Sequence, residues 1–96
     1  MTLPTGHPYK LVVIYWLDAV HHQDDIELAE VAERPPGCIC VCAGWLVRDT
    51  PEVVTVVAEY EANAPVSLRD SWDIPRGLVV QMHELSTRPR KTKVKP

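Results

Sequence analysis

Phenylalanine is absent from this 96-residue sequence, which also contains only four glycines and three cysteines. The aromatic side chains are three tryptophans and three tyrosines, and all six lie in or beside β-branched runs: Tyr9, Tyr15, Trp16, Trp45, Tyr60 and Trp72. Such residues favour the half-buried surface of a pleated sheet. Three cysteines are an odd number and too few for a disulfide framework, so we expect reduced thiols and an intracellular setting.

Long apolar runs are missing as well. A transmembrane helix takes about 20 consecutive apolar residues, whereas the run Leu11–Leu17 ends at Asp18. Only Lys10 precedes this run, so it does not resemble a secretory signal either. We therefore expect a soluble protein with no membrane partner.

Motifs that carry chemistry are not found in the sequence. It has no G-x-S-x-G or H-E-x-x-H motif and no glycine-rich phosphate loop. We therefore predict no catalytic residue, no cofactor and no enzyme activity. An enzyme that uses the polar stretch His21–Asp25 is the least favoured alternative.

Acidic residues are absent from the end of the chain. Residues 1–85 hold thirteen acids against five bases, a balance of −8, whereas residues 86–96 hold no acid and five bases: Arg88, Arg90, Lys91, Lys93 and Lys95. A charged stretch without apolar periodicity predicts a disordered tail. Its cations could bind nucleic-acid phosphates, which makes a nucleic-acid-binding accessory protein one alternative. A tail that only improves solubility is the simpler interpretation.

The apolar runs that are present predict a β-rich fold. The stretch Cys38–Tyr60 is typical of a β-hairpin, with its polar corner at Arg48–Glu52. Gly44 inside the first strand of this hairpin predicts a bulge or a bend. The five expected strands are Tyr9–Leu17, Cys38–Val47, Val53–Glu61, Val66–Ile74 and Leu78–Leu85.

One short helix is expected between the first two strands. Asp24 and Glu27 have the spacing of a capping box, and Arg34–Gly37 would end the helix after about nine residues. A helix this short does not persist alone, so we expect it to pack on the sheet. Together these elements predict a small five-stranded barrel over residues 9–85, between an extended N-terminal arm (1–8) and the tail (86–96).

Three blocks of the sequence resemble a family of short proteins from bacteriophages and prophages. They are YWLDA (15–19), CAGWLVRDTPEVVTVVAEY (42–60) and IPRGLVVQMHEL (74–85). The resemblance covers about residues 11–85 and implies an SH3-like or Sm-like barrel, in which the IPRG corner is similar to the turn before the last SH3 strand. It also implies the cytoplasm of a bacterial host, but no settled biochemical role.

Binding residues are expected among the tryptophans, which are favoured at binding hot spots. We predict Trp72, Arg76 and Trp45 as ligand- or partner-binding residues, with packing in the core or between subunits as the alternative for the tryptophans. Both faces of the first strand are apolar, which favours a homo-oligomer. The leading expectation is a non-enzymatic interaction module that binds a protein or a small ligand. A structural virion component is a further alternative.

Two groups of potential metal ligands are present, but neither predicts a metal site. Cys38, Cys40 and Cys42 would spread over about 13 Å of one strand, too far for one zinc ion, so we expect small buried side chains. The group His21, His22, Asp24 and Asp25 fits a solvated loop with a helix cap better than a cation site. His83 is expected on the surface or at a rim. Neither the cysteines nor the His21–His22 pair belongs to the phage-family pattern.

Overall fold

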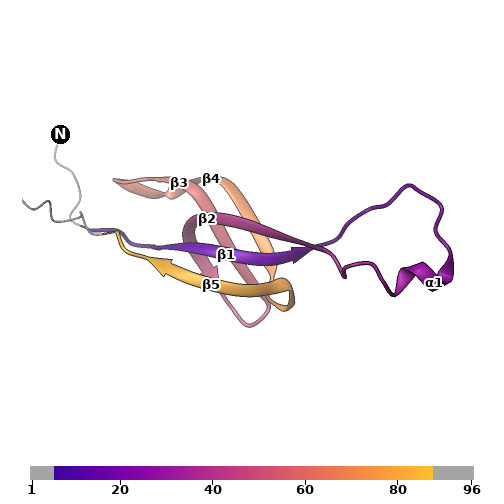
Figure 1. The fold of residues 1–96 in the computed structure, drawn as a ribbon. Helices are drawn as coiled ribbons and strands as arrows, with labels where there is room; N and C mark the ends of the chain where they lie inside the picture. Colours follow the sequence, from indigo (N-terminus) through magenta and orange to yellow (C-terminus); the bar gives the residue numbers. More distant parts are fainter. Residues whose placement is uncertain (1–5, 88–96) are drawn as a thin grey trace, which may run out of the picture.

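The computed structural model describes residues 6–87, apart from the side chains of residues 64–66. The strands are β1 (Lys10–Asp18), β2 (Cys38–Asp49), β3 (Val53–Glu61), β4 (Ala64–Pro75) and β5 (Val79–Leu85) (Figure 1). A four-residue helix, α1 (Leu28–Val31), separates β1 from β2, and a 3-10 turn, η1 (Arg76–Leu78), joins β4 to β5. The prediction of a mainly β fold with five strands and one helix between the first two is confirmed.

All five strands belong to one antiparallel sheet with the order β4-β3-β2-β1-β5. β1 pairs with β2 along its full length, from Lys10 opposite Leu46 to Asp18 opposite Cys38. The sheet is open, because β4 and β5 form its two edges. Residues 1–5 of the expected N-terminal arm and residues 88–96 of the expected tail lie outside the described residues.

The hydrophobic core lies on one face of this sheet. Its buried side chains come from β1, β3 and β4: Val12, Ile14, Val54, Val56 and Ile74. Partly buried side chains pack around them: Trp16, Cys42, Leu46, Val79 and Met82. Burial of each large aliphatic side chain contributes about 1.5–3 kcal/mol, so this face holds the sheet together.

The opposite face of β2 is also apolar, and it is exposed. Strict alternation from the β1–β2 register places four residues on it, which we call the outer strip: Ile39, Val41, Ala43 and Trp45. Ile39 is 52% exposed and Val41 is 58% exposed. The outer strip runs along β2 from the end that follows α1 to the end near Lys10.

Gly44 permits a close approach of strands but does not form the predicted bulge. The shift in the β2–β3 register falls between Leu46 and Arg48, so the irregularity lies further along β2 than predicted. A Cβ atom on Gly44 would lie 2.7 Å from the carbonyl oxygen of Val57 and 3.3 Å from the Cβ of Val56. β3 therefore crosses β2 too closely for a side chain at this position.

The helix corrects two predictions. Its N-cap is Glu27, whose side chain makes no capping hydrogen bond, so a capping box that starts at Asp24 does not form. Nor does α1 pack on the sheet: it lies in residues 19–37, which extend beyond the end of the β1–β2 pair (Figure 1). β1 and β2 stay paired up to Asp18 and Cys38, so the chain leaves in line with the strands and away from the core.

We call residues 19–37 the acidic loop, because it contains five acids and one base. All of its residues are described, and none of them is buried. Leu28, on α1, is 88% exposed. Within residues 6–87, no helix has the length and apolar character needed to cross a membrane.

Candidate functional site: an aromatic pocket

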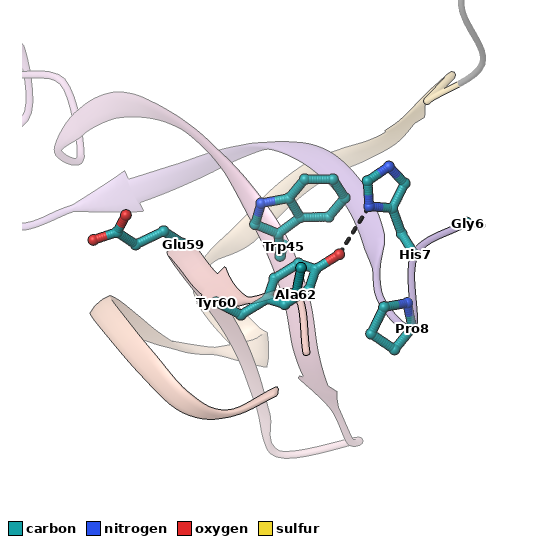
Figure 2. Close-up of a pocket in the computed structure, with 7 residues that line it drawn as sticks. All are labelled: Gly6, His7, Pro8, Trp45, Glu59, Tyr60 and Ala62. Carbon is teal, nitrogen blue, oxygen red and sulfur yellow. Dashed lines mark hydrogen bonds between the residues drawn. The ribbon is translucent and has the colours of Figure 1, made fainter. Parts of the chain in front are cut away.

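An aromatic pocket lies where the N-terminal segment meets β2 and β3 (Figure 2). It has a volume of about 350 Å³ and is lined by Gly6, His7, Pro8, Trp45, Glu59, Tyr60 and Ala62. This volume is at the lower end of the range of ligand sites, about 300–1,000 Å³. The pocket is therefore large enough for a small ligand or for side chains of a partner.

The sheet register positions the two strand residues of the pocket. Trp45 lies opposite Leu11 on β1 and Val57 on β3, and Val57 is fully buried. Tyr60 follows on β3, and its ring meets the Trp45 ring edge-on, with 5.2 Å between centroids and 85° between planes. Edge-to-face pairs add about 0.5–1.5 kcal/mol beyond the area they bury.

His7 closes the side of the pocket away from Glu59. Its ring lies 4.7 Å from the Trp45 ring and is tilted by 32°. A hydrogen bond of 2.8 Å joins His7 Nδ1 to the Tyr60 hydroxyl, and Tyr9 packs edge-on against Tyr60 at 5.2 Å. Four rings from three segments thus hold one another in place. This reduces the conformational entropy that the pocket loses when a ligand binds.

Charge beside the pocket is paired within the sheet. Glu59 Oε1 lies 3.3 Å from Arg69 Nη1, and the same guanidinium is 3.5 Å from Glu61. Figure 2 shows the Glu59 carboxylate pointing away from His7, beyond Trp45. The interior of the pocket therefore presents mainly aromatic and aliphatic surface, which suits an apolar group.

A second, more polar hollow adjoins the aromatic pocket. It has a volume of about 460 Å³ and shares His7 and Pro8 with the aromatic pocket, and Ser86 and Thr87 also line it. In the sequence, the basic segment 88–96 follows these two residues. Its predicted nucleic-acid-binding residues lie outside the described residues: Arg88, Arg90, Lys91, Lys93 and Lys95.

Trp45 and Trp72, both predicted as binding residues, lie on opposite faces of the sheet. Trp72 is opposite Val56, which faces the core, whereas Trp45 is opposite the next residue, Val57. Trp72 is 54% exposed on the edge strand β4. The structure therefore does not combine the two tryptophans into one site.

Arg76, the third predicted binding residue, is engaged inside the fold. Its Nε and Nη2 atoms donate to the carbonyl oxygen of Thr50 at 3.2 and 3.1 Å, and Nη2 also pairs with the Asp49 carboxylate. Its backbone N–H donates to the carbonyl of Glu52 at 2.9 Å. These bonds fasten the β4–β5 corner to the β2–β3 turn, so the structure gives Arg76 a structural role.

A polar ladder, Arg48–Thr55–Asp73, crosses β2, β3 and β4 outside the pocket. The Thr55 hydroxyl accepts from Arg48 Nε at 2.9 Å and donates to Asp73 Oδ1 at 2.6 Å. Arg48 Nη2 reaches the same carboxylate oxygen at 3.0 Å. The hydrogen bond from Thr55 and then the contacts with Arg48 lower the pKa of Asp73. The ladder ties three strands together and satisfies the buried Thr55 hydroxyl.

The three cysteines are free and alternate along β2; Cys40 and Cys42 are half-buried, whereas Cys38 is exposed, so the prediction of a buried side chain is wrong for Cys38. Burial, followed by the neighbouring Cys38, raises the pKa of Cys40, and burial also raises the pKa of Cys42. Thiols with a raised pKa remain protonated and are poor nucleophiles and ligands. Over residues 6–87, no three His, Cys, Asp or Glu side chains form a group that could hold a metal ion.

The histidines predicted in loops or at a rim lie outside the aromatic pocket. His21 and His22 are exposed in the acidic loop. His83, on β5, is exposed and packs edge-on against Tyr15 at 6.0 Å. The histidine that does line the pocket is His7, which the sequence did not single out.

Of the other lining residues that the sequence did not single out, Tyr60 had a usable signal. The hairpin corner at Arg48–Glu52 sets the β2–β3 pairing, which brings Tyr60 close to Trp45. His7 and Pro8 had no such signal, because they precede the first strand and their contact with Tyr60 spans 53 residues of sequence.

No protein-family model, curated protein or solved structure matches this chain. The function is therefore inferred from the geometry of the pocket and from the chemistry of its lining.

Proposed function

We propose that the chain is a non-enzymatic interaction module of the phage and prophage type, and that the aromatic pocket receives an apolar side chain of a protein partner. The ring cluster supports this proposal. His7, Tyr9, Trp45 and Tyr60 hold one another in place around a hollow of about 350 Å³. Rigid aromatic side chains with a polar atom are typical of protein-binding hot spots.

The lining favours an apolar guest over a phosphate or a metal ion. None of the described lining residues is a lysine or an arginine, and Glu59 is already paired with Arg69. An apolar group gains about 25 cal/mol for each Å² that it removes from water. The η1 corner before β5 lies where the phage resemblance places the turn before the last SH3 strand.

A titration with two small probes tests this function. N-acetyl-leucine methylamide presents one apolar side chain, and N-acetyl-asparagine methylamide is a polar control of similar size. We expect the leucine probe to bind the unoccupied pocket with a dissociation constant of about 1 mM, or about −4 kcal/mol. NMR shifts should be confined to the region of His7, Trp45 and Tyr60.

Two variants sharpen this test. His7→Ala should weaken binding of the leucine probe several-fold, because it removes one wall of the pocket while leaving the core untouched. Trp72→Ala removes an exposed indole from the other face and should leave the titration unchanged. Equal binding of both probes, or shifts centred on Trp72, would contradict the proposal.

A further inference from the structure

The acidic loop extends from one end of the β1–β2 pair (Figure 1), and the aromatic pocket lies towards the other end of this pair. β1 begins near the pocket, with Leu11 opposite Trp45, and ends at the acidic loop, with Asp18 opposite Cys38. We propose that the acidic loop of one copy of the chain occupies the aromatic pocket of a second copy, in a reciprocal twofold dimer. This inference rests on the proposed function, because it names the partner that fills the same pocket.

The acidic loop presents apolar side chains of the kind that the pocket suits. Leu28 and Val31 are exposed and lie three residues apart on α1, so they share one side of the helix. A helix of four residues is not stable alone in water and needs a surface to pack against. Apolar anchors at this spacing are those that a helix inserts into an apolar groove.

The outer strip connects the acidic loop with the pocket on each copy. Ile39 lies just after the loop, Trp45 lines the pocket, and Val41 and Ala43 lie between them on the same face of β2. In the proposed dimer, the outer strip of one copy packs face to face on the outer strip of the other, with the two β2 strands antiparallel. Each loop then lies at the pocket end of the other copy. Twofold dimers are also the commonest closed assembly of identical chains.

Charge favours the same antiparallel arrangement. The acidic loop holds five acids and one base, whereas residues 88–96 hold five bases and no acid. In the sequence, the basic segment follows Ser86 and Thr87, which line the hollow that adjoins the pocket. Within one chain, the nine residues of β1 span about 30 Å between the acidic loop and the end of the sheet that carries this hollow. An antiparallel dimer brings opposite charges together, whereas a parallel dimer would bring like charges together.

Mixing two complementary variants tests the contact. L28D/V31D removes the apolar anchors from the acidic loop, where no residue is buried. H7D places a carboxylate at the pocket wall, before the first strand. We expect the wild-type chain to dimerise at micromolar concentration in sedimentation velocity. Each variant alone should dimerise at least about tenfold more weakly, a change of about 1.4 kcal/mol.

The mixture distinguishes a loop-to-pocket contact from any other dimer. L28D/V31D keeps an intact pocket and H7D keeps an intact loop, so an equimolar mixture should form heterodimers through one contact. Trp72→Ala, which alters the other face, should dimerise like the wild-type chain. Normal dimerisation of either defective variant, or a mixture no more associated than its components, would overturn the inference.

The leucine probe, titrated into L28D/V31D so that no apolar loop competes for the pocket, and into the wild-type chain if that chain is monomeric, separates failure of the dimer from failure of the proposed function. A wild-type chain that stays monomeric while its pocket binds N-acetyl-leucine methylamide would overturn the dimer and leave the proposed function standing. The Trp45 indole NMR signal of the wild-type dimer should differ from that of L28D/V31D. If the wild-type chain dimerises and the two signals are the same, the loop-to-pocket contact is also overturned. Absence of both dimer and probe binding would overturn both proposals.

Discussion

Thr55 shows how a single polar residue can be buried in this sheet without cost to the fold. A buried hydroxyl needs hydrogen-bond partners, and Thr55 finds them on both neighbouring strands, in Arg48 and Asp73. The three residues lie directly opposite one another in the register of β2, β3 and β4. The ladder is therefore specific to this register, and slipping any of the three strands by one residue would break it.

Asp73 should make the stability of the fold depend on acid pH. Its pKa is lowered by the hydrogen bond from Thr55 and by Arg48, so folding favours the carboxylate form. The resulting stabilisation is complete above the unfolded pKa of about 3.9 and is lost as pH falls through the lower folded value. In urea titrations, Asp73→Asn should therefore be less stable than wild type near neutral pH.

The same comparison in acid provides the control. The difference in unfolding free energy between wild type and Asp73→Asn should shrink as pH falls below about 4, because the wild-type carboxyl then also becomes neutral. Ser71→Ala, two residues earlier on β4, should show a pH-independent difference. If the difference in unfolding free energy between wild type and Asp73→Asn stays constant down to about pH 2, the ladder does not stabilise the Asp73 carboxylate.

Gly37 is required where the acidic loop returns to the sheet. A Cβ atom at this position would lie 2.4 Å from the backbone oxygen of Asp18 and 2.9 Å from the Leu17 side chain. Gly37→Ala should therefore force the ends of β1 and β2 apart and destabilise the fold by about 1–3 kcal/mol, as other overpacked sites do. Urea unfolding followed by tryptophan fluorescence measures this loss.

Gly77 supplies a matched control for that substitution. A Cβ atom on Gly77 meets no atom within 4 Å, so Gly77→Ala should change the unfolding free energy by less than about 0.5 kcal/mol. If Gly37→Ala and Gly77→Ala change the unfolding free energy equally, the close contact at Gly37 does not determine the stability of the sheet.

At the scale of elements, the strands and the presence of one helix could be predicted from sequence, whereas the start of the helix and its packing could not. Runs of β-branched and aromatic residues define strands locally, so the predicted Val53–Glu61 coincides with β3 and the predicted Tyr9–Leu17 differs from β1 by one residue at each end. Asp24 and Glu27 have the spacing of a capping box, but a short helix persists only where a surface supports it. Whether the helix meets such a surface depends on the direction in which the chain leaves β1 and returns to β2.

The site was predictable to the same limited degree. Trp45 could be proposed because tryptophan is favoured at binding sites, whatever the fold. Trp72 met the same criterion but lies on the other face, because two successive residues of β3 pair with the two tryptophans. His7 joins the pocket only through the path of the N-terminal segment, which no local pattern reveals.

The acidic loop should be dispensable for the fold of a single chain. Replacing residues 21–35 with a short Gly-Ser turn removes no buried side chain. It also shortens the β1–β2 connection, and each halving of a flexible loop lowers its closure cost by about 0.6 kcal/mol. We expect the shortened chain to unfold at equal or slightly higher urea concentration than the wild-type monomer.

The shortened chain also needs a structural control. Its ¹H–¹⁵N spectrum should retain the signals of β1–β5, and the exposed outer strip should remain as a source of weak association. A chain that loses its sheet on this replacement would show that the acidic loop supports the fold in a way that its exposure does not indicate.

At the scale of the whole molecule, the acidic and basic stretches of the sequence connect to opposite ends of the sheet. The acidic loop extends from one end of β1, and the basic segment 88–96 follows residues that line the hollow at the other end. Attraction between such regions is screened by salt, because the Debye length falls from about 10 Å at 0.1 M to about 3 Å at 1 M ionic strength. The proposed dimer should therefore respond to salt more strongly than the sheet itself.

A chain that ends at Thr87 tests this expectation. We expect its dimer to be several-fold weaker than wild type at low salt and nearly insensitive to added salt, because the five cations of residues 88–96 are gone. E30Q/E33Q, in and beside α1, should reduce the salt dependence of the full chain in the same direction. Glu52→Gln, in the β2–β3 turn, should leave it unchanged. Sedimentation at several salt concentrations measures all four proteins, and an unaltered salt dependence after truncation would place the attraction between copies elsewhere on the chain.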